Sequence, residues 1–233
     1  MGNVDRKIKR FFKTLVGKDF FPRIDCRCKK ERLGSKYCGW EVAVEKIKKD
    51  SVIYSFGVGE DASFDIELIN QFGVVVHAFD PTPGSINWVQ AQNFSEHFVF
   101  HKYGLADFDG ELLFNPPRDH KSISYTILER PSKNKKAIAL PVKKLETIMK
   151  ELRHGEIAIL KMDIEGAEYQ VIDSMAASAI RPGQVLVEFH HRFPGVGLKK
   201  TKDAIKKLRK MGYGLFSVSS SGEEFCFMLK SIV

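Results

Sequence analysis

Hydrophobic and polar residues follow a pattern that predicts strands alternating with helices along most of the chain. Short apolar runs bounded by Gly, Pro or polar residues predict strands at 51–56, 74–79, 98–103, 112–114, 158–162, 185–189, 215–218 and 225–229. Apolar residues at helical spacing predict helices at 40–49, 62–72, 86–92, 145–152, 167–179 and 201–211. This alternation predicts an α/β fold with a mostly parallel sheet, covered by helices on both faces. The last two strands predict a closing hairpin with one antiparallel strand.

The first residues have a different pattern, in which apolar side chains recur among lysines and arginines. Ile8, Phe11, Phe12 and Leu15 lie at helical spacing and predict an amphipathic helix over 3–16. Such a helix can cap the core of its own domain or make peripheral contact with an anionic membrane. We favour the cap.

The net charge of the N-terminal segment also differs from that of the rest of the chain. Residues 1–50 hold 15 Lys/Arg and 7 Asp/Glu, a net charge of +8, whereas residues 51–233 hold 22 of each. We therefore describe 1–50 as a basic helical arm within the same domain as the neutral body, 51–233. A uniformly basic nucleic-acid-binding protein is not expected to show this distribution. The spacing of the four cysteines fits no zinc motif, and no signal peptide is evident, so we expect free thiols and a cytoplasmic protein.

Small or ionisable residues follow five successive predicted strands. They are Gly57 and Gly59, then Asp80, then 104–107, then Asp163, Glu165 and Gly166, then 190–192. Ligands of open parallel sheets bind beyond the carboxyl ends of the strands, so we expect a site at this edge.

Gly57-Val58-Gly59 stands where a strand passes into a helix, and it lets a ligand approach the backbone closely. Ala62 occupies the place of the third glycine of a dinucleotide-binding fingerprint, so the glycines alone are weak evidence. Asp80 ends the next strand and is placed to accept hydrogen bonds from two ribose hydroxyls. The alternative is that Asp80 caps the turn at Pro81.

Asp163 and Glu165 follow a buried strand and lie close together in sequence. They could hold a sulfonium or ammonium group, bind a divalent ion, or take a proton from a substrate hydroxyl. Glu168 could instead cap the next helix. We predict Asp163, Glu165 and His190 as catalytic residues. A divalent cation is compatible with this group, but we predict no metal ligand.

Five segments together resemble the FkbM-type methyltransferases, a class of S-adenosylmethionine-dependent enzymes. They are VIYSFGVGED (52–61), FDP (79–81), GLAD (104–107), LKMDIEGAE (160–168) and VEFH (187–190). The K-x-D-I-E-G-A-E string is the most specific of them. The stretch GSKYCGW (34–40) is also similar to less-studied methyltransferase-like proteins.

The resemblance implies a Rossmann-like fold of seven strands with an antiparallel last strand, and S-adenosyl-L-methionine as cofactor. Gly57 and Gly59 would cradle its methionine part, Asp80 its ribose, and Ala106 with Asp107 its adenine. The full set of implied cofactor residues is Gly57, Gly59, Glu60, Asp61, Asp80, Pro81, Leu105, Ala106, Asp107 and Asp163. Ser55 stands where many methyltransferases carry an acid, which Glu60 or Asp61 could replace.

Members of this family commonly methylate hydroxyl oxygens on sugars or other natural products, so the resemblance implies a small hydroxylated substrate. We expect the arm and a polar 115–140 loop over the site to set specificity. The alternatives are a nicotinamide oxidoreductase, a nucleic-acid methyltransferase using basic stretches at 27–36, 133–136 and 199–210, and a non-catalytic binding protein. No base-flipping motif accompanies the basic stretches, so nucleic acid is not the expected substrate.

Overall fold

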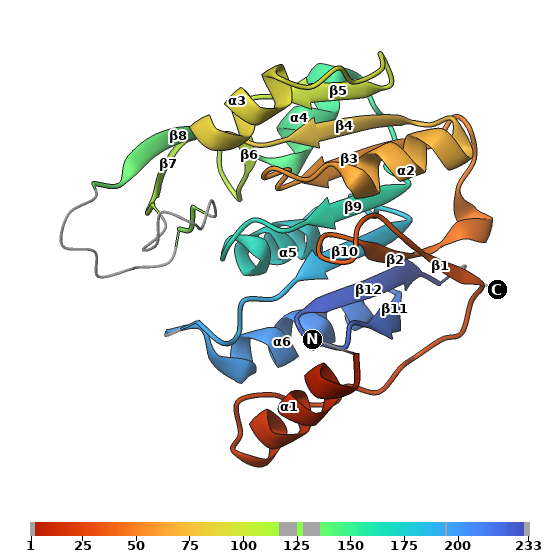
Figure 1. Cartoon of the computed structure of the whole chain (residues 1–233), viewed down its shortest axis with the longest axis vertical. Coiled ribbons are helices and arrows are strands. Elements are labelled where there is room, and N and C mark those ends of the chain that lie inside the picture. Colours follow the sequence, from red (N-terminus) through yellow and green to blue (C-terminus); the bar gives the residue numbers. More distant parts are fainter. Residues whose placement is uncertain (1–2, 117–124, 128–135, 194, 231–233) are drawn as a thin grey trace.

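The fold is built on a central seven-stranded sheet. The computed structural model describes residues 3–116, 125–127, 136–193 and 195–230. The strands are β3 (Val52–Phe56), β4 (Val75–Phe79), β5 (Phe98–His101), β9 (Ile159–Met162), β10 (Gln184–Glu188), β11 (Tyr213–Val218) and β12 (Glu224–Leu229). Their order is β11-β12-β10-β9-β3-β4-β5 (Figure 1). β12 is antiparallel to both neighbours, and the pairings from β10 to β5 are parallel. The predicted mostly parallel sheet with a closing hairpin is confirmed.

Alternating side chains of the strands face two different core layers. Tyr54 and Phe56 of β3 point toward one layer, whereas Ile53 points toward the other. The first layer is covered by α4 (Leu145–Leu152), α5 (Glu168–Ala177) and α6 (Gly197–Lys210). The second is covered by α2 (Ser63–Phe72) and α3 (Pro83–Gln90), joined by the hairpin of β1 (Lys30–Leu33) and β2 (Trp40–Ala43).

The predicted helix at 40–49 is wrong. This segment forms β2, followed by a short 3-10 helix, η1 (Val44–Lys46). Trp40 and Val42 are buried on the sheet, while Glu41 between them is only half-buried, which is strand periodicity. Gln184 of β10 fixes the segment, because its side-chain amide bonds both the N–H (2.8 Å) and the C=O (3.0 Å) of Ala43. Tertiary packing therefore overrides the helical spacing.

A second, three-stranded sheet stands beside the main one. It consists of β6 (Gly104–Leu105), β7 (Gly110–Phe114) and β8 (Ile138–Lys143), in the order β6-β8-β7. The predicted strand 98–103 therefore ends early at His101, and the end of the predicted 115–140 loop is the start of β8. Within that loop, 117–124 and 128–135 lie outside the described residues.

The first helix, α1 (Asn3–Leu15), lies at one end of the molecule, next to β11 and α6 (Figure 1). The helix is confirmed, but its predicted role as a core cap is wrong. Phe11, Phe12 and Leu15 are 54%, 62% and 66% exposed. The helix is instead attached through Arg10, which is buried and donates to the carbonyls of Ser219 (3.1 Å) and Phe20 (2.7 Å). Among the described residues, no helix is both long and apolar enough to cross a membrane.

Candidate functional site

A cavity of about 310 Å³ lies at the carboxyl ends of β3, β4 and β9. This is the edge at which the sequence predicts a ligand, and the size is within the usual range of small-molecule sites. The predicted residues that line the cavity are Gly57, Gly59, Glu60, Asp61, Asp80, Pro81, Leu105, Asp163 and Glu165. Lining residues that were not predicted as site residues include Tyr37, Trp40, Asp65, Lys161, Glu188 and Glu224.

Three of the predicted residues do not line this cavity: Ala106, Asp107 and His190, the last of which is described below. Ala106 packs with Phe114, Leu140 and Val142 in the small core of the second sheet. Asp107 is exposed and does not line the cavity. The structure therefore separates Ala106 and Asp107 from the cavity, although they directly follow Leu105, which lines it.

Gly57 is required by the close approach of two strand ends. Its φ of +87° is a conformation that favours glycine, and a Cβ atom at this position would lie 2.0 Å from the carbonyl oxygen of Asp163. The N–H of Asp163 in turn bonds the carbonyl of Phe56 at 3.1 Å. The turn after β3 and the turn after β9 are thus in direct backbone contact, with the cavity beside them.

Asp80 organises the glycine turn from the end of β4. One of its carboxylate oxygens accepts hydrogen bonds from the N–H groups of Val58 and Gly59, both at 3.0 Å. The other accepts from the N–H (2.9 Å) and the hydroxyl (2.6 Å) of Thr82. Four donors fill the acceptor positions of a carboxylate. The geometry matches the turn-capping alternative, and Asp80 lines the cavity with its hydrogen-bonding capacity already used.

Asp61 holds the segment before β2 against the start of α2. It accepts hydrogen bonds from the Ser35 hydroxyl and the Ser63 N–H, each at 2.8 Å. Two acceptor positions of the Asp61 carboxylate are therefore used within the protein. A different residue, Asp65 of α2, is buried beside Ser55 at the cavity wall. Burial raises the pKa of Asp65 to about 6, against the lowering effect of Lys161. The helical spacing of the sequence places Asp65 on the buried face of α2. This spacing is the signal by which Asp65 could have been identified as a site residue from the sequence.

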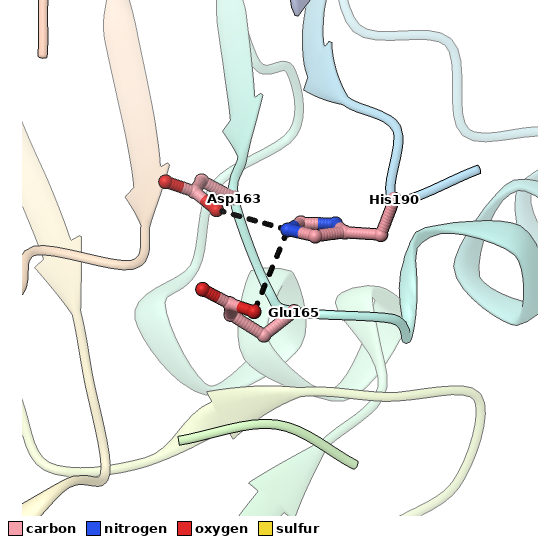
Figure 2. Close-up of side chains that lie close together, drawn as sticks. All are labelled: Asp163, Glu165 and His190. Carbon is pink, nitrogen blue, oxygen red and sulfur yellow. Dashed lines mark ion pairs between the residues drawn. The ribbon is translucent and has the colours of Figure 1, made fainter. Parts of the chain in front are cut away.

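The three predicted catalytic side chains come together at the ends of β9 and β10. Figure 2 shows Asp163, Glu165 and His190 pointing toward one another. The Nε2 atom of His190 lies 4.0 Å from Oδ1 of Asp163 and 3.5 Å from Oε2 of Glu165. The three ligand atoms all lie within 4.8 Å of one another. The structure thus brings the three residues together, and their catalytic role stays a prediction.

Glu168 orients both the turn and the histidine. It is fully buried at the start of α5, and its carboxylate accepts from the N–H groups of Ile164 (3.2 Å) and Gly166 (3.1 Å). Its Oε1 also lies 3.0 Å from Nδ1 of His190. Glu168 bonds the turn before α5 and not the first N–H groups of the helix, so the predicted helix cap is wrong. The contact with His190 fixes which ring nitrogen faces Asp163 and Glu165.

Crowding of acids controls the ionisation of the group. Burial raises the pKa of Asp163, although Lys161 and His190 lower it. Burial and the neighbouring Asp163 together raise the pKa of Glu188 well above its ordinary value. Burial alone would lower the pKa of His190, but the carboxylates, Glu168 first, raise it well above its ordinary value. The group therefore favours a cation at the position of the imidazole.

Part of the predicted loop over the site is described, and it contacts the catalytic turn. The N–H of Ile127 bonds the carbonyl of Glu165 at 3.3 Å, and the Thr126 hydroxyl bonds the same oxygen. Tyr125 lines the cavity. This segment thus lies beside Glu165 at the wall of the cavity.

The four cysteines are free, as predicted. Cys38 lines the cavity, but burial raises the pKa of its thiol to about 11. A thiol that stays protonated is a poor nucleophile, so covalent cysteine catalysis is not supported here.

Comparison with known proteins assigns the family. Residues 37–215 match the Methyltransferase FkbM domain. The chain belongs to this family. The match spans the residues that line the cavity from Tyr37 to Glu188, including the turn from Asp163 to Glu168, whereas Glu224 of β12 lies beyond it. It confirms the resemblance predicted from the sequence and favours a methyltransferase over a nicotinamide oxidoreductase.

The FkbM chain is also similar to individual proteins. It is 25% identical over 179 residues to the probable methyltransferase-like protein 24 of Homo sapiens, covering 72% of this chain and 42% of that protein. The Rattus norvegicus protein of the same name gives 25% identity, with 72% and 43% covered. The chain thus spans less than half the length of these relatives.

Among solved structures, the FkbM methyltransferase of Methylobacillus flagellatus KT aligns with a TM-score of 0.49 and 14% identity, over 78% of this chain and 44% of that one. Aeropyrum pernix fibrillarin, solved with natively bound S-adenosyl-L-methionine, aligns with a TM-score of 0.37 and 8% identity, over 91% of this chain and 85% of that one.

Proposed function

We propose that this FkbM chain is an S-adenosyl-L-methionine-dependent O-methyltransferase that acts on a hydroxyl group of a small molecule, such as a sugar. The observation that carries the proposal is the cavity itself, which has a glycine turn on one side and the Asp163–Glu165–His190 group on another. Methyl transfer to a hydroxyl needs a donor site and a proton acceptor next to each other. This cavity supplies both.

The residues present fit an adenosyl-sulfonium cofactor. Gly57 and Gly59 leave the backbone of the turn without side chains, and Asp80 holds that turn in place. Pro81 and Leu105 provide an apolar wall that suits an adenine ring, while Glu60 lies at the cavity and is exposed. Asp65 supplies a buried carboxyl beside Ser55 for the positive amine of the methionine part.

The cofactor supplies a methyl group that is already activated by its sulfonium charge. The protein has to position the acceptor oxygen and remove its proton. Asp163 lines the cavity, and a carboxyl group whose pKa is raised by burial is a stronger base than an ordinary one. His190 carries positive charge beside Asp163 and Glu165, so it orients these carboxylates and does not itself serve as the proton acceptor.

A nucleic-acid substrate is less well supported. Several basic residues of the 199–210 stretch are already paired with acids: Lys199 with Asp203 (2.9 Å), Arg209 with Asp25 (2.8 Å) and Lys207 with Asp173. Cations that are already paired with acids release fewer counterions from a phosphate backbone, so they contribute less to nucleic-acid binding.

Calorimetric titration with S-adenosylhomocysteine and with NAD tests the cofactor. We expect saturable binding of the first and none of the second. Screening hydroxylated metabolites for uptake of a labelled methyl group then tests the reaction. Asp163→Asn should retain cofactor binding and lose transfer, while the exposed control Asp107→Asn should keep both. Binding of NAD alone would favour the oxidoreductase, and binding of neither compound would favour a non-catalytic protein.

A further inference from the structure

The Asp163–Glu165–His190 group has the geometry of a small metal site. Ligand atoms bound to one ion at about 2.0–2.2 Å lie at most about 4.4 Å apart. The distances from Nε2 of His190 to Asp163 (4.0 Å) and Glu165 (3.5 Å) are both within this limit. All three ligand atoms lie within 4.8 Å of one another, so only a slight contraction is needed to surround an ion.

His190 is oriented as a ligand. Its side chain is only 6% exposed, and it points between the two carboxylates from the end of β10 (Figure 2). On its other side, Nδ1 lies 3.0 Å from the fully buried Glu168. A carboxylate behind a histidine fixes the tautomer that presents Nε2 to a metal, and this arrangement recurs in metalloproteins.

Carboxyl groups are crowded around His190. Four carboxyl groups converge here: Asp163, Glu165, Glu168 and Glu188. Among the described residues, the cations that act on Asp163 are Lys161 and a protonated His190. Lys161 is also committed to the carbonyl of Gly57. A divalent ion among these crowded carboxyl groups would reduce their mutual repulsion.

We propose that Asp163, Glu165 and His190 bind one divalent transition-metal ion, Mn²⁺ or Zn²⁺, which would take the place of the Nε2 proton of His190. An imidazole with two carboxylates suits these ions better than Ca²⁺ or Mg²⁺, which prefer oxygen ligands alone. The inference rests on the proposed function only for the role of the ion. Beside the cavity, a divalent ion would lower the pKa of the acceptor hydroxyl, so that a weaker base could remove its proton.

The test measures metal binding in the absence of any cofactor or acceptor. The full chain is treated with chelator, and Mn²⁺ is titrated while the free ion is followed by electron paramagnetic resonance. Zn²⁺ is titrated into histidine-labelled protein and followed by nitrogen NMR. The variants are Glu165→Gln, which changes a side chain at the cavity wall, and His190→Ala. The control is His97→Ala, a half-buried histidine outside the cavity.

We expect one Mn²⁺ per chain, with affinity at least tenfold weaker in Glu165→Gln and His190→Ala and unchanged in His97→Ala. Zn²⁺ should shift the Nε2 resonance of His190. Absence of saturable binding, or binding unchanged in both variants, would overturn the inference and assign the group to ion pairing of a protonated His190. S-adenosylhomocysteine binding is measured on the same metal-free sample. Failure of metal binding can then be told apart from failure of cofactor binding, on which the proposed function depends.

A second, independent observation concerns the outer face of α1. Of the eleven exposed large hydrophobic side chains among the described residues, seven lie between Ile8 and Ile24. We call these seven the N-terminal apolar face: Ile8, Phe11, Phe12, Leu15, Val16, Phe21 and Ile24. A surface helix normally buries its apolar side and exposes its charges, whereas α1 buries Arg10 and exposes phenylalanines.

Basic residues surround this face. Lys9, Lys18 and Arg23 are exposed beside it, and Lys13 is half-buried. Asp19 is buried against Arg10 at 3.4 Å and against Arg192, so it adds no exposed negative charge here. Exposed apolar side chains flanked by Lys and Arg are the chemistry that binds a lipid surface with anionic headgroups.

We infer that the N-terminal apolar face docks the chain peripherally on an anionic lipid bilayer. The test is sedimentation of the full chain with phosphatidylcholine vesicles, with and without phosphatidylserine. The variant is Phe11→Ser with Phe12→Ser, and the control is Leu113→Ser, which is 60% exposed on β7. We expect binding only to phosphatidylserine vesicles, weakened by salt and at least tenfold by the double substitution but not by the control.

Failure to bind phosphatidylserine vesicles, or equal loss of binding in the variant and the control, would overturn this inference. Concentration-dependent self-association that the double substitution abolishes, without vesicle binding, would assign the face to a second copy of the chain.

Discussion

Asp80, Asp61 and Glu168 show that acids at the edge of a sheet can hold backbone as well as ligand. Each accepts hydrogen bonds from N–H groups of a turn that lines or supports the cavity. Hydrogen bonds to a charged acceptor are stronger than neutral ones, so these carboxylates fix the turns in place before any ligand arrives. Their effect on binding is therefore exerted largely through the shape of the cavity.

At this scale we predict that Asp80→Asn destabilises the fold. The amide would place an N–H₂ group against either Val58 and Gly59 or Thr82, which leaves buried donors without an acceptor. We expect a loss of about 1–3 kcal/mol in the free energy of unfolding, measured with urea, together with weaker cofactor binding. Asp107→Asn, at an exposed position, should change neither quantity. Wild-type stability in Asp80→Asn would mean that the turn does not depend on this carboxylate.

At the scale of elements, the β1–β2 hairpin covers part of the sheet, as helices do elsewhere. It packs Leu33, Trp40 and Val42 over the second core layer and brings Tyr37 and Cys38 to the cavity. The hairpin is joined to the sheet by the side chain of Gln184, which is almost completely buried. The Gln184 amide is therefore one of the contacts that hold this wall of the cavity, together with the Ser35–Asp61 hydrogen bond.

We predict that Gln184→Ala loosens the hairpin, because the N–H and C=O of Ala43 would lose their buried partners. The expected cost is about 2–4 kcal/mol in the free energy of unfolding. Hydrogen exchange should also become faster at the Ala43 amide than at amides of β9. Gln90→Ala, on the exposed side of α3, is the control and should leave both measurements unchanged. Unaltered exchange at Ala43 in Gln184→Ala would show that the hairpin is held by its packing alone.

At the scale of the whole molecule, the sheet gathers four aromatic and imidazole side chains from distant parts of the chain. The Tyr54 hydroxyl lies 2.8 Å from Nδ1 of His154, and Nδ1 of His77 lies 3.0 Å from Nε2 of His101. Burial lowers the pKa values of His101 and His154, and lowers that of His77 to about 4. These histidines are therefore neutral in the folded protein at neutral pH.

This cluster predicts a loss of stability in acid. An unfolded histidine takes up a proton near pH 6.5, whereas folded His77 does so only near pH 4. Between these values the unfolded state binds more protons, so the stability that His77 contributes is present above pH 6.5 and is lost as the pH falls toward 4. The stability difference between wild type and His77→Gln should therefore shrink over this range. A difference independent of pH would contradict the assignment, and His97→Gln serves as the control.

The sequence alone determined the order of the elements from β3 to β12 apart from β6 and β8, because a strand alternates with period two and a helix with period 3.6, and both patterns are local. It also determined which edge of the sheet carries chemistry, since the residues after each strand are fixed by chain order. Only the tertiary structure decided that Trp40–Ala43 is a strand, that Asp80 bonds the glycine turn, that Asp65 lies beside Ser55, that Glu168 holds His190, and that α1 exposes its apolar side. Each of these depends on contacts between residues far apart in sequence, and no local pattern records such contacts.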